Sequence, residues 1–478
     1  MTIVNLFWKQ SMIYGVGTIL VRAVSFLLLP LYTTFFTTAE AGYVYLLFTF
    51  IAFAQVFYNY GMDSAFLKFI SQNKESKESV LSTSLLILLF SSAAFSLILY
   101  IFSTPISIFY LEINEPFWIR LCSLILFIDV LSARIMAYLR VINRPIYFST
   151  ISIVSALLTI TSNIYFITVL NMGITGVLYG TLVGTLFRFI LVTPLLVSGT
   201  NYNLFKFDLS KKMFTFGLPF FPAALFFIIM ELADRYLLLQ LVDIETVGVY
   251  SIAYKMGSVL MFLITGFNLA WQPLFHREQQ NENRLEIFST ISTHFLVIMI
   301  LVGGIISIWL PVIVQIPIGG GNTLIGKDFW GSINIIPVIM LSYIFYAGYI
   351  LQMPSLYDGN NQKWSPILRG MGAVINIGLN LVLIPKYGGM GAAIATLSAY
   401  AIMFLSLFML NRKWLRISFN YSRISTLLGI CIMGVYYLDS NPVEVIWRLL
   451  ISIIILSTGL PLLQSLYINQ NQNSLTNK

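Results

Sequence analysis

The amino-acid sequence predicts an all-α integral membrane protein of about 14 transmembrane helices. Hydrophobic residues make up 58% of the chain and charged residues 10%, whereas a soluble domain has about 25% charged residues. Apolar stretches of roughly 20 residues, each long enough to cross a hydrocarbon core of about 30 Å, fill the chain from end to end. The period-two alternation of a membrane β-barrel is absent, so the spans are helices, which satisfy their backbone hydrogen bonds internally.

The spans follow one another through short connections, none of which could hold a folded domain outside the membrane. The expected spans are 11–32, 41–60, 80–102, 118–138, 147–170, 176–198, 214–237, 246–268, 289–311, 329–353, 365–385, 388–410, 422–439 and 444–468. The first apolar run is too long for the core of a signal peptide, and no small-residue cleavage site follows it. We therefore expect the first span to be an uncleaved anchor.

Lysine and arginine are distributed unequally between the two sets of loops. The odd-numbered loops hold about three of them, Arg235, Lys327 and Lys386. The even-numbered loops hold fifteen, which are Lys68, Lys74, Lys77, Arg140, Arg144, Lys206, Lys211, Lys212, Arg277, Arg284, Lys363, Arg412, Lys413, Arg416 and Arg423. Positive charge marks cytoplasmic loops, so we expect both termini in the cytoplasm and most of the net charge of +8 at the inner surface.

The chain also repeats itself. The glycine-rich segment 173–184 matches 388–399 at a constant offset of 215 residues, and Gly42 matches Gly248 at an offset of 206. Six spans therefore map onto six spans that start on the same side, as in parallel repeats related by an axis along the membrane normal. We expect lobes at 1–212 (spans one to six) and 213–411 (spans seven to twelve), followed by two further spans and a cytoplasmic tail at 412–478.

Four basic side chains within the expected spans are candidate site residues. Arg22 is near the middle of the first, Arg134 and Arg188 are in the fourth and sixth, and Lys255 is in the eighth. A lone cation at the bilayer centre costs at least about 2.5–3.5 kcal/mol, so each needs an anion, a carbonyl oxygen or a water-filled cavity. They either form a cationic cavity that binds an anionic group such as a phosphate, or they pair with carboxylates of the spans.

The candidate carboxylates are Asp129, Glu231 and Asp234. Asp129 is near the middle of the fourth span, where it is either a site for a coupling cation or proton, or the partner of an arginine. Glu231 precedes Arg235 by four residues, the favourable order for an ion pair on one helix face. We expect these two residues to form a local pair near the outer boundary.

Polar and helix-breaking residues suggest further sites. Gly217, Pro219 and Pro222 lie at the start of the seventh span, where proline removes a helix hydrogen bond. They form either a hinge for alternating access or a static bend. Asn376 and Asn380 share one face of the eleventh span, where they bond to another helix or line a cavity.

No catalytic residue, cofactor or metal site is predicted. The two cysteines, Cys122 and Cys431, lie in apolar runs without metal-ligand spacing, and two histidines are too few for an imidazole-based metal site. No glycine-rich phosphate loop follows a strand, which argues against an ATP-driven pump. The basic loops fit membrane topology and contact with anionic phospholipid, and they give no support to nucleic-acid binding.

Four stretches resemble the Wzx-type polysaccharide flippases, which translocate lipid-linked oligosaccharides and belong to the MOP (multidrug/oligosaccharidyl-lipid/polysaccharide) exporter superfamily. The stretches are FGLPFFPAALFFIIMELADRY, GVYSIAYKMGSVLMFLITGFNLAWQPLF, VINIGLNLVLIPKYGGMGAAIAT and NYGMDSAFLKF. The resemblance covers nearly the whole chain. It implies a V-shaped, non-enzymatic flippase with two six-helix lobes and two extra helices.

The resemblance further implies a substrate and a mechanism. The substrate is an undecaprenyl-diphosphate-linked repeat unit of O-antigen (lipopolysaccharide), capsule or another surface polysaccharide, moved to the outer leaflet of the bacterial inner membrane. Transport is by alternating access coupled to a proton or sodium gradient, and the implied protein partners are polysaccharide polymerase and export machinery. Flippases of the peptidoglycan precursor have cavity arginines on the first and eighth helices, so Arg22 and Lys255 are expected to contact the diphosphate.

Three alternatives stay open at this point. A multidrug extruder of the same superfamily would favour acidic sites and normally has twelve spans. A peptidoglycan-precursor flippase shares the fold. A membrane-embedded polysaccharide polymerase or acyltransferase would need a long outer loop or an embedded catalytic constellation, whereas the outer loops here are short and His294 is isolated in the ninth span.

Overall fold

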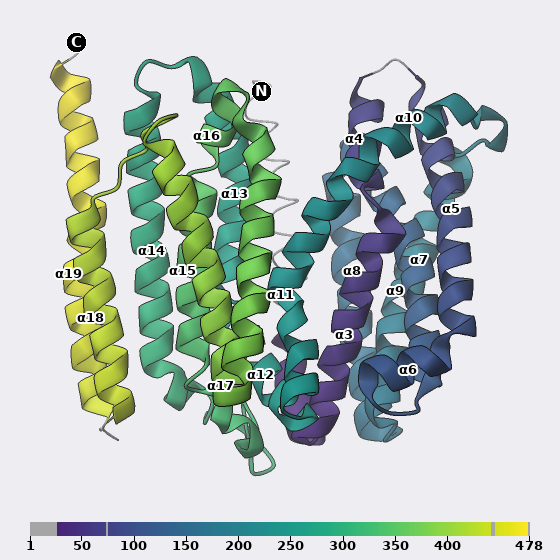
Figure 1. The fold of residues 1–478 in the computed structure, drawn as a ribbon, viewed down its shortest axis with the longest axis horizontal. Coiled ribbons are helices and arrows are strands. Elements are labelled where there is room, and N and C mark those ends of the chain that lie inside the picture. Colours follow the sequence, from purple (N-terminus) through teal and green to yellow (C-terminus); the bar gives the residue numbers. More distant parts are fainter. Residues whose placement is uncertain (1–25, 73–74, 441–444, 477–478) are drawn as a thin grey trace. The chain divides into compact units, whose positions relative to one another are not determined.

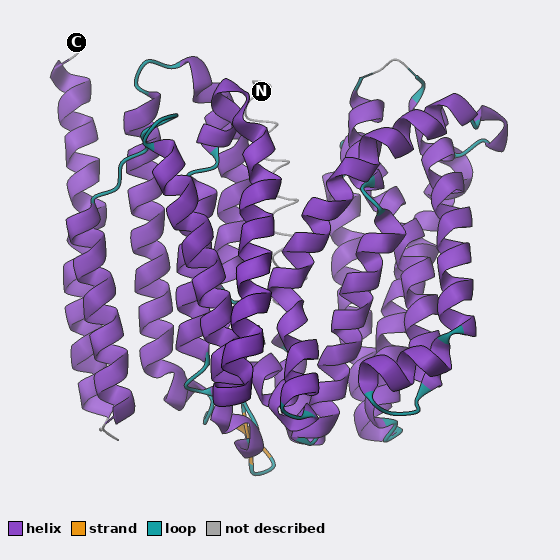
Figure 2. Cartoon of the chain, in the orientation of Figure 1, coloured by secondary structure: helices purple, strands orange, loops and turns teal. Residues whose placement is uncertain are grey.

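The computed structural model describes residues 26–72, 75–440 and 445–476. These residues are almost entirely helical and divide into two compact units, Met1–Ser251 and Ile252–Lys478 (Figures 1 and 2). The all-α membrane fold that the sequence predicts is confirmed: ten described helices are long and apolar enough to cross a membrane, and a bent pair, α12 and α13, makes an eleventh.

The first unit contains the described helices up to α11 and the beginning of α12. The helices are α2 (Leu28–Phe35), α3 (Thr38–Asn59), α4 (Met62–Ser71), α5 (Lys77–Ile101), α6 (Ser103–Leu111), α7 (Pro116–Val141), α8 (Pro145–Ile164), α9 (Gly173–Gly199), α10 (Phe207–Gly217), α11 (Phe221–Leu241) and α12 (Ile244–Gly257). Short turns complete it: η1 (Tyr165–Val169), η2 (Tyr202–Leu204) and η3 (Leu218–Phe220). The lobe boundaries expected after residues 212 and 411 stay predictions.

The second unit contains the remaining helices and one small hairpin. The helices are α13 (Leu260–Arg277), α14 (Arg284–Ile313), α15 (Ile336–Leu351), α16 (Pro354–Tyr357), α17 (Trp364–Asn411), α18 (Tyr421–Ser440) and α19 (Val445–Thr476), with turns η4 (Glu278–Gln280), η5 (Lys327–Ser332) and η6 (Asp358–Lys363). Strands β1 (Pro317–Gly319) and β2 (Asn322–Thr323) pair antiparallel, with Pro317 opposite Thr323. Three consecutive glycines with positive φ, 319–321, form the hairpin's tip.

The described helices coincide with the expected spans from the second onward, and residues 11–25 of the first lie outside the described part. The seventh span is α10, η3 and α11 in sequence, and the eighth is α12 and α13, which meet at 43°. The eleventh and twelfth spans run together as α17, which breaks at Gly388, where φ is 53° and ψ is −131°. The spans are therefore visible in the sequence, whereas the sharpness of each break is a property of single residues.

Small residues bring helices of the first unit into close contact. A Cβ atom added to Gly184 of α9 would lie 1.9 Å from Oγ1 of Thr159 on α8, and one added to Gly180 would lie 2.4 Å from Nδ2 of Asn163. Such stripes allow helix backbones to approach closely in lipid. The repeated glycines of the sequence thus serve packing between α8 and α9.

The segments that the 206-residue offset relates also contact each other. A Cβ atom on Gly42 of α3 would meet the carbonyl oxygen of Ile244 at 2.3 Å, and one on Gly248 of α12 would meet that of Thr38 at 1.9 Å. Thr38 and Ile244 are themselves 206 residues apart, so the contact is reciprocal, as at a two-fold axis. The repeat in the sequence therefore has a counterpart in the packing of α3 against the start of α12.

Helices α14, α15, α17, α18 and α19 pack together in the second unit (Figure 1). Helices α18 and α19 lie against α14 around a core that includes Val297, Ile300, Leu427, Cys431 and Ile455. This packing makes the two last spans part of the second unit. It also forms the walls of a pocket described below.

Candidate functional site

A polar cluster lies inside the first unit, where α3, α7 and α9 meet. Arg188 of α9 forms an ion pair with Asp129 of α7 and donates a hydrogen bond from Nε to Oγ of Ser132 (3.2 Å). Gln55 of α3 donates to the second carboxylate oxygen of Asp129 at 2.7 Å. Asp129 and Arg188 lie near the middle of their helices, so the cluster places both charges deep within apolar segments.

This ion pair is accessible. The side chains of Arg188 and Asp129 retain 27% and 21% of their exposure, and Gln55 beside them is exposed. The pair thus compensates both charges, as expected for charged residues at membrane depth, and leaves part of each side chain exposed. Of the two roles predicted for Asp129, the structure provides the arginine partner; a coupling role stays a prediction.

A second cluster surrounds Arg134 one and a half turns further along α7. Its side chain is 1% exposed and pairs through Nη2 with Asp63 of α4 (3.1 Å), which is itself 56% exposed. Nη2 also donates to Asn59 at 3.4 Å, and the guanidinium lies 4.8 Å from the ring centre of Phe66. Nε and Nη1 of Arg134 are buried without a hydrogen-bond partner among the described residues.

The two arginines differ in accessibility. Arg134 is enclosed by protein, with 1% of its side chain exposed, whereas 27% of the Arg188 side chain is exposed. Asp63 was not among the expected partners, because it lies 71 residues away in a segment that the sequence marks only as a loop following the second span. Of these two cations, Arg188 is therefore the more accessible to an anion.

The carboxylates of α11 form a separate buried group. Asp234 accepts a hydrogen bond from the hydroxyl of Tyr250 at 2.5 Å and pairs with Nη1 of Arg235 at 3.0 Å. Arg235 reaches Glu231 through its backbone carbonyl oxygen, at 2.8 Å. The local interaction expected between Glu231 and Arg235 thus occurs at the backbone, and the neighbouring carboxylate carries the ion pair.

Of the two remaining predicted cations, Arg22 and Lys255, the structure describes only Lys255. Arg22 lies outside the described residues. Lys255 is half-buried in the last turn of α12, next to Tyr254, whose hydroxyl accepts a hydrogen bond from Tyr343 at 3.2 Å. Contact of Arg22 and Lys255 with a diphosphate stays a prediction.

Asn376 and Asn380 are both fully buried in α17. Asn380 donates to the side-chain oxygen of Asn376 at 3.0 Å, and Asn376 donates to Oγ1 of Thr396 at 3.3 Å. The bond between Asn376 and Thr396 connects the two halves of α17 across its break at Gly388. The contacts are those of helix packing in lipid, and a role in lining a cavity stays a prediction.

The predicted hinge residues lie at a real discontinuity. Gly217 ends α10, Pro219 lies in the 3-10 turn η3, and Pro222 occupies the first turn of α11. A Cβ atom on Gly61, which has a φ of +80°, would lie 2.0 Å from the carbonyl oxygen of Gly217. The break therefore rests against the left-handed turn between α3 and α4; its use as a hinge stays a prediction.

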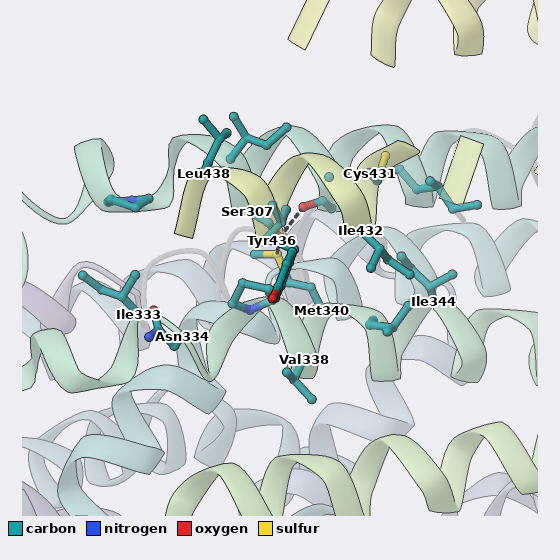
Figure 3. Close-up of a pocket in the computed structure, with 18 of the residues that line it drawn as sticks. Ser307, Ile333, Asn334, Val338, Met340, Ile344, Cys431, Ile432, Tyr436 and Leu438 are labelled. Atoms are coloured by element: carbon teal, nitrogen blue, oxygen red, sulfur yellow. Dashed lines mark hydrogen bonds between the residues drawn. The ribbon is translucent and has the colours of Figure 1, made fainter. Parts of the chain in front are cut away.

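A pocket of about 520 Å³ opens in the second unit, and sequence reasoning missed it. Figure 3 shows Ser307 of α14, Val338, Met340 and Ile344 of α15, and Cys431, Ile432 and Tyr436 of α18 gathered around it. Arg448 of α19 also lines the pocket and donates a hydrogen bond to the carbonyl oxygen of Ile308. The lining is mostly apolar and suits a hydrocarbon chain. No local sequence motif could have predicted the pocket, because its walls come from four separate helices.

Among the described residues, no group of three or more His, Cys, Asp or Glu side chains could hold a metal ion. The described polar clusters are instead pairs of opposite charge with amide and hydroxyl partners.

Comparison with known proteins identifies the family. A family model described as "Polysaccharide biosynthesis protein" matches residues 31–313, more than half of the chain. The chain belongs to this polysaccharide biosynthesis family. No curated protein sequence matches it significantly.

Solved structures identify the fold. The lipid II flippase MurJ in an inward closed conformation matches with a TM-score of 0.76 at 19% identity, over 96% of this chain and 99% of that chain. A MATE transporter in the straight conformation matches with a TM-score of 0.61 at 17% identity, over 88% and 96%. The Vibrio cholerae MATE transporter VcmN in its bent form matches with 0.57 at 12% identity, over 86% and 96%.

These matches confirm the expected fold, which the chain shares with MurJ and with MATE transporters of the MOP superfamily. At these identities the solved structures bear on the fold alone, and the family model adds polysaccharide biosynthesis. The matched proteins are flippases and transporters, and none is an enzyme. The polysaccharide family member described here is accordingly a multi-pass membrane protein with the fold of flippases and transporters.

Proposed function

We propose that the protein moves an undecaprenyl-diphosphate-linked oligosaccharide repeat unit from the inner to the outer leaflet of the bacterial cytoplasmic membrane. The observation that supports this most is the accessible Arg188–Asp129 pair at mid-helix in the first unit, in a chain of the polysaccharide biosynthesis family. Both termini lie in the cytoplasm, and the flipped unit passes to polysaccharide polymerase and export machinery.

The pair suits the task because a diphosphate must cross about 30 Å of hydrocarbon with its charge compensated. An arginine guanidinium binds phosphate oxygens through two parallel charge-assisted hydrogen bonds. In the proposed cycle the diphosphate replaces Asp129 as the partner of Arg188. Asp129, released into the same polar environment, then takes up a proton or a sodium ion, which couples transport to the gradient.

Other residues support the two ends of the substrate. Arg22 and Lys255 add positive charge for the diphosphate, as the flippase resemblance implies. The apolar pocket between α14, α15 and α18 accommodates part of the isoprenoid chain while the headgroup crosses. Bending at Gly217, Pro219 and Pro222 allows the alternation of access.

Translocation by purified protein in proteoliposomes tests the proposal. A fluorescent undecaprenyl-diphosphate oligosaccharide is supplied, and its exposure on the opposite leaflet is followed with and without a proton or sodium gradient. We expect Arg188→Gln to reduce the rate by about tenfold or more, and Arg188→Lys to fall in between, because lysine keeps the charge and loses the bidentate geometry. Arg120→Gln, at the beginning of α7, is the matched control and should retain the parent rate.

Two outcomes would replace the proposal. Export of a cationic dye without lipid movement would favour a multidrug extruder, for which the MATE-like fold is the supporting observation. Preference for a peptidoglycan lipid precursor over oligosaccharide lipids would favour a precursor flippase, to which the MurJ-like fold points.

A further inference from the structure

Positive charge is concentrated around the loop between α17 and α18. No Asp or Glu lies between Asp358 and Asp439, whereas Arg412, Lys413, Arg416 and Arg423 lie in or next to this loop. Among the described residues, neither Arg412 nor Arg416 forms an ion pair with a carboxylate. An anion from outside the chain could therefore pair with these two arginines.

The loop is ordered. Leu415, Ile417 and Phe419 are buried, while the residues between them, Arg416 and Ser418, are exposed. One side of the loop therefore packs against the second unit, and the side chains of the other side are exposed. The backbone N–H of Ser418 donates to Oγ of Ser289 in the first turns of α14 at 3.0 Å, which fastens the loop to that helix.

The ordered loop and the ends of both helices enclose a hollow of about 80 Å³. Its lining is Phe408, Asn411, Arg412, Arg416, Ile417, Ser418 and Tyr421, without a carboxylate. The guanidinium of Arg412 lies 5.3 Å from the ring centre of Phe408, one turn earlier on α17, and such contacts orient an arginine. The volume holds a few water molecules or one phosphate group.

The hollow lies at a membrane interface. The loop joins the ends of two apolar helices, and it is at the end of the unit where α13 connects to α14 (Figure 1). Trp364 and Trp414 contact each other there, with ring centres 5.9 Å apart, and tryptophan is enriched at the headgroup level. Two arginines at this depth meet lipid headgroups.

We propose that this hollow is a binding site for the phosphate of an anionic lipid headgroup, with Arg412 and Arg416 as its ligands and the hydroxyl of Ser418 beside them. It is separate from the Arg188–Asp129 pair and does not depend on the transported substrate. Arginine suits such a site because its planar fork matches phosphate bidentately. The bound lipid holds the α17–α18 connection against α14 at the membrane surface.

Native mass spectrometry of the full-length protein in detergent tests the site. Phosphatidylglycerol is titrated against zwitterionic phosphatidylcholine, and apparent affinities are compared for the parent, Arg412→Lys, Arg416→Lys and Lys413→Gln. We expect each arginine-to-lysine variant to lose about tenfold in affinity for phosphatidylglycerol, because the charge stays but the bidentate contact is lost. Lys413 lies outside the lining, so Lys413→Gln is the matched control. Its affinity for phosphatidylglycerol should fall by no more than about fivefold, the effect of removing one surface charge near an anionic membrane.

The opposite pattern would overturn the site. Diffuse attraction would leave the affinity of both lysine variants for phosphatidylglycerol unchanged and make Lys413→Gln the weakest binder of the four proteins. Displacement of phosphatidylglycerol by equimolar inorganic phosphate would exclude a lipid ligand. A polyprenyl diphosphate in a third titration identifies the source: stronger retention than phosphatidylglycerol assigns the hollow to the substrate headgroup, and weaker retention assigns it to a bilayer lipid. Unchanged thermal unfolding of the lysine variants excludes misfolding.

Discussion

The reciprocal contact between α3 and α12 predicts a specific destabilisation by Gly248→Ala. The added Cβ would lie 1.9 Å from the carbonyl oxygen of Thr38, whereas ordinary contacts of this kind begin at 3.4 Å. The two helices would have to separate by about 1.5 Å, because the clash is with backbone and no rotamer relieves it. Overpacking of this kind costs about 1–3 kcal/mol.

Gly378→Ala isolates that cost. Gly378 is a helical glycine of α17 whose Cβ would meet nothing within 4 Å, so this variant gains the helix propensity of alanine, about 1 kcal/mol, without a clash. Gly248→Ala gains the same propensity. The difference between the two variants in free energy of unfolding should therefore equal the overpacking cost alone.

Unfolding midpoints in detergent, followed by tryptophan fluorescence, provide the assay. We expect Gly378→Ala to unfold at or above the parent midpoint and Gly248→Ala clearly below Gly378→Ala. Gly42→Ala, which meets the carbonyl oxygen of Ile244 at 2.3 Å, should resemble Gly248→Ala. The double variant should be less destabilised than the sum, because one separation of the helices relieves both clashes. Equal midpoints for Gly248→Ala and Gly378→Ala would refute the reciprocal contact.

Three further outcomes follow from the charges and the topology. Asp129→Asn and Arg188→Gln should each lower the free energy of unfolding. The loss should be smaller than the 3–5 kcal/mol typical of a fully buried pair, because both side chains are partly exposed, and the double variant should recover stability. Single variants as stable as the double variant would disprove the pairing. Arg134→Met should unfold at or above the parent midpoint, because an apolar side chain removes the orphaned N–H groups; a large loss would mean that the ion pair stabilises the unit. In intact cells a membrane-impermeant maleimide should label Gly320→Cys and should label Lys413→Cys only after permeabilisation; the reverse pattern would invert the topology.

The spans were predictable from the sequence because hydropathy is a local property. Each run of about 20 apolar residues can satisfy its backbone only as a helix, whatever its neighbours are. The 206-residue offset was also visible, since Gly42 and Gly248 follow from a close approach that tolerates no side chain. The break between the eleventh and twelfth spans was visible too, because the boundary expected at residues 385–388 coincides with the non-helical Gly388 of α17.

The partners of the charges were only partly predictable. Asp129 was an expected partner for the cations in general, but its pairing with Arg188 bridges α7 and α9 over 59 residues. Arg134 pairs with Asp63, which the sequence places outside the spans. The i,i+4 rule favoured the Glu231 side chain for Arg235, whereas the carboxylate of Asp234 takes the ion pair. Such choices depend on how helices are rotated against each other, which hydropathy does not encode.

The two kinds of arginine in this chain follow from what surrounds them. Arg134, Arg188 and Arg235, within apolar helices, each have a carboxylate from the chain itself, because hydrocarbon offers no counter-ion and an unpaired charge there is costly. Among the described residues Arg412 and Arg416, where the helices end, have no carboxylate partner, and the lipid site proposed above would supply a phosphate there. The proposed function uses both arrangements: an internal anion that a diphosphate can displace at mid-membrane, and cations that hold the protein against the anionic leaflet. The proposed cycle requires Asp129 between substrates, because without it Arg188 would be an uncompensated charge within an apolar helix.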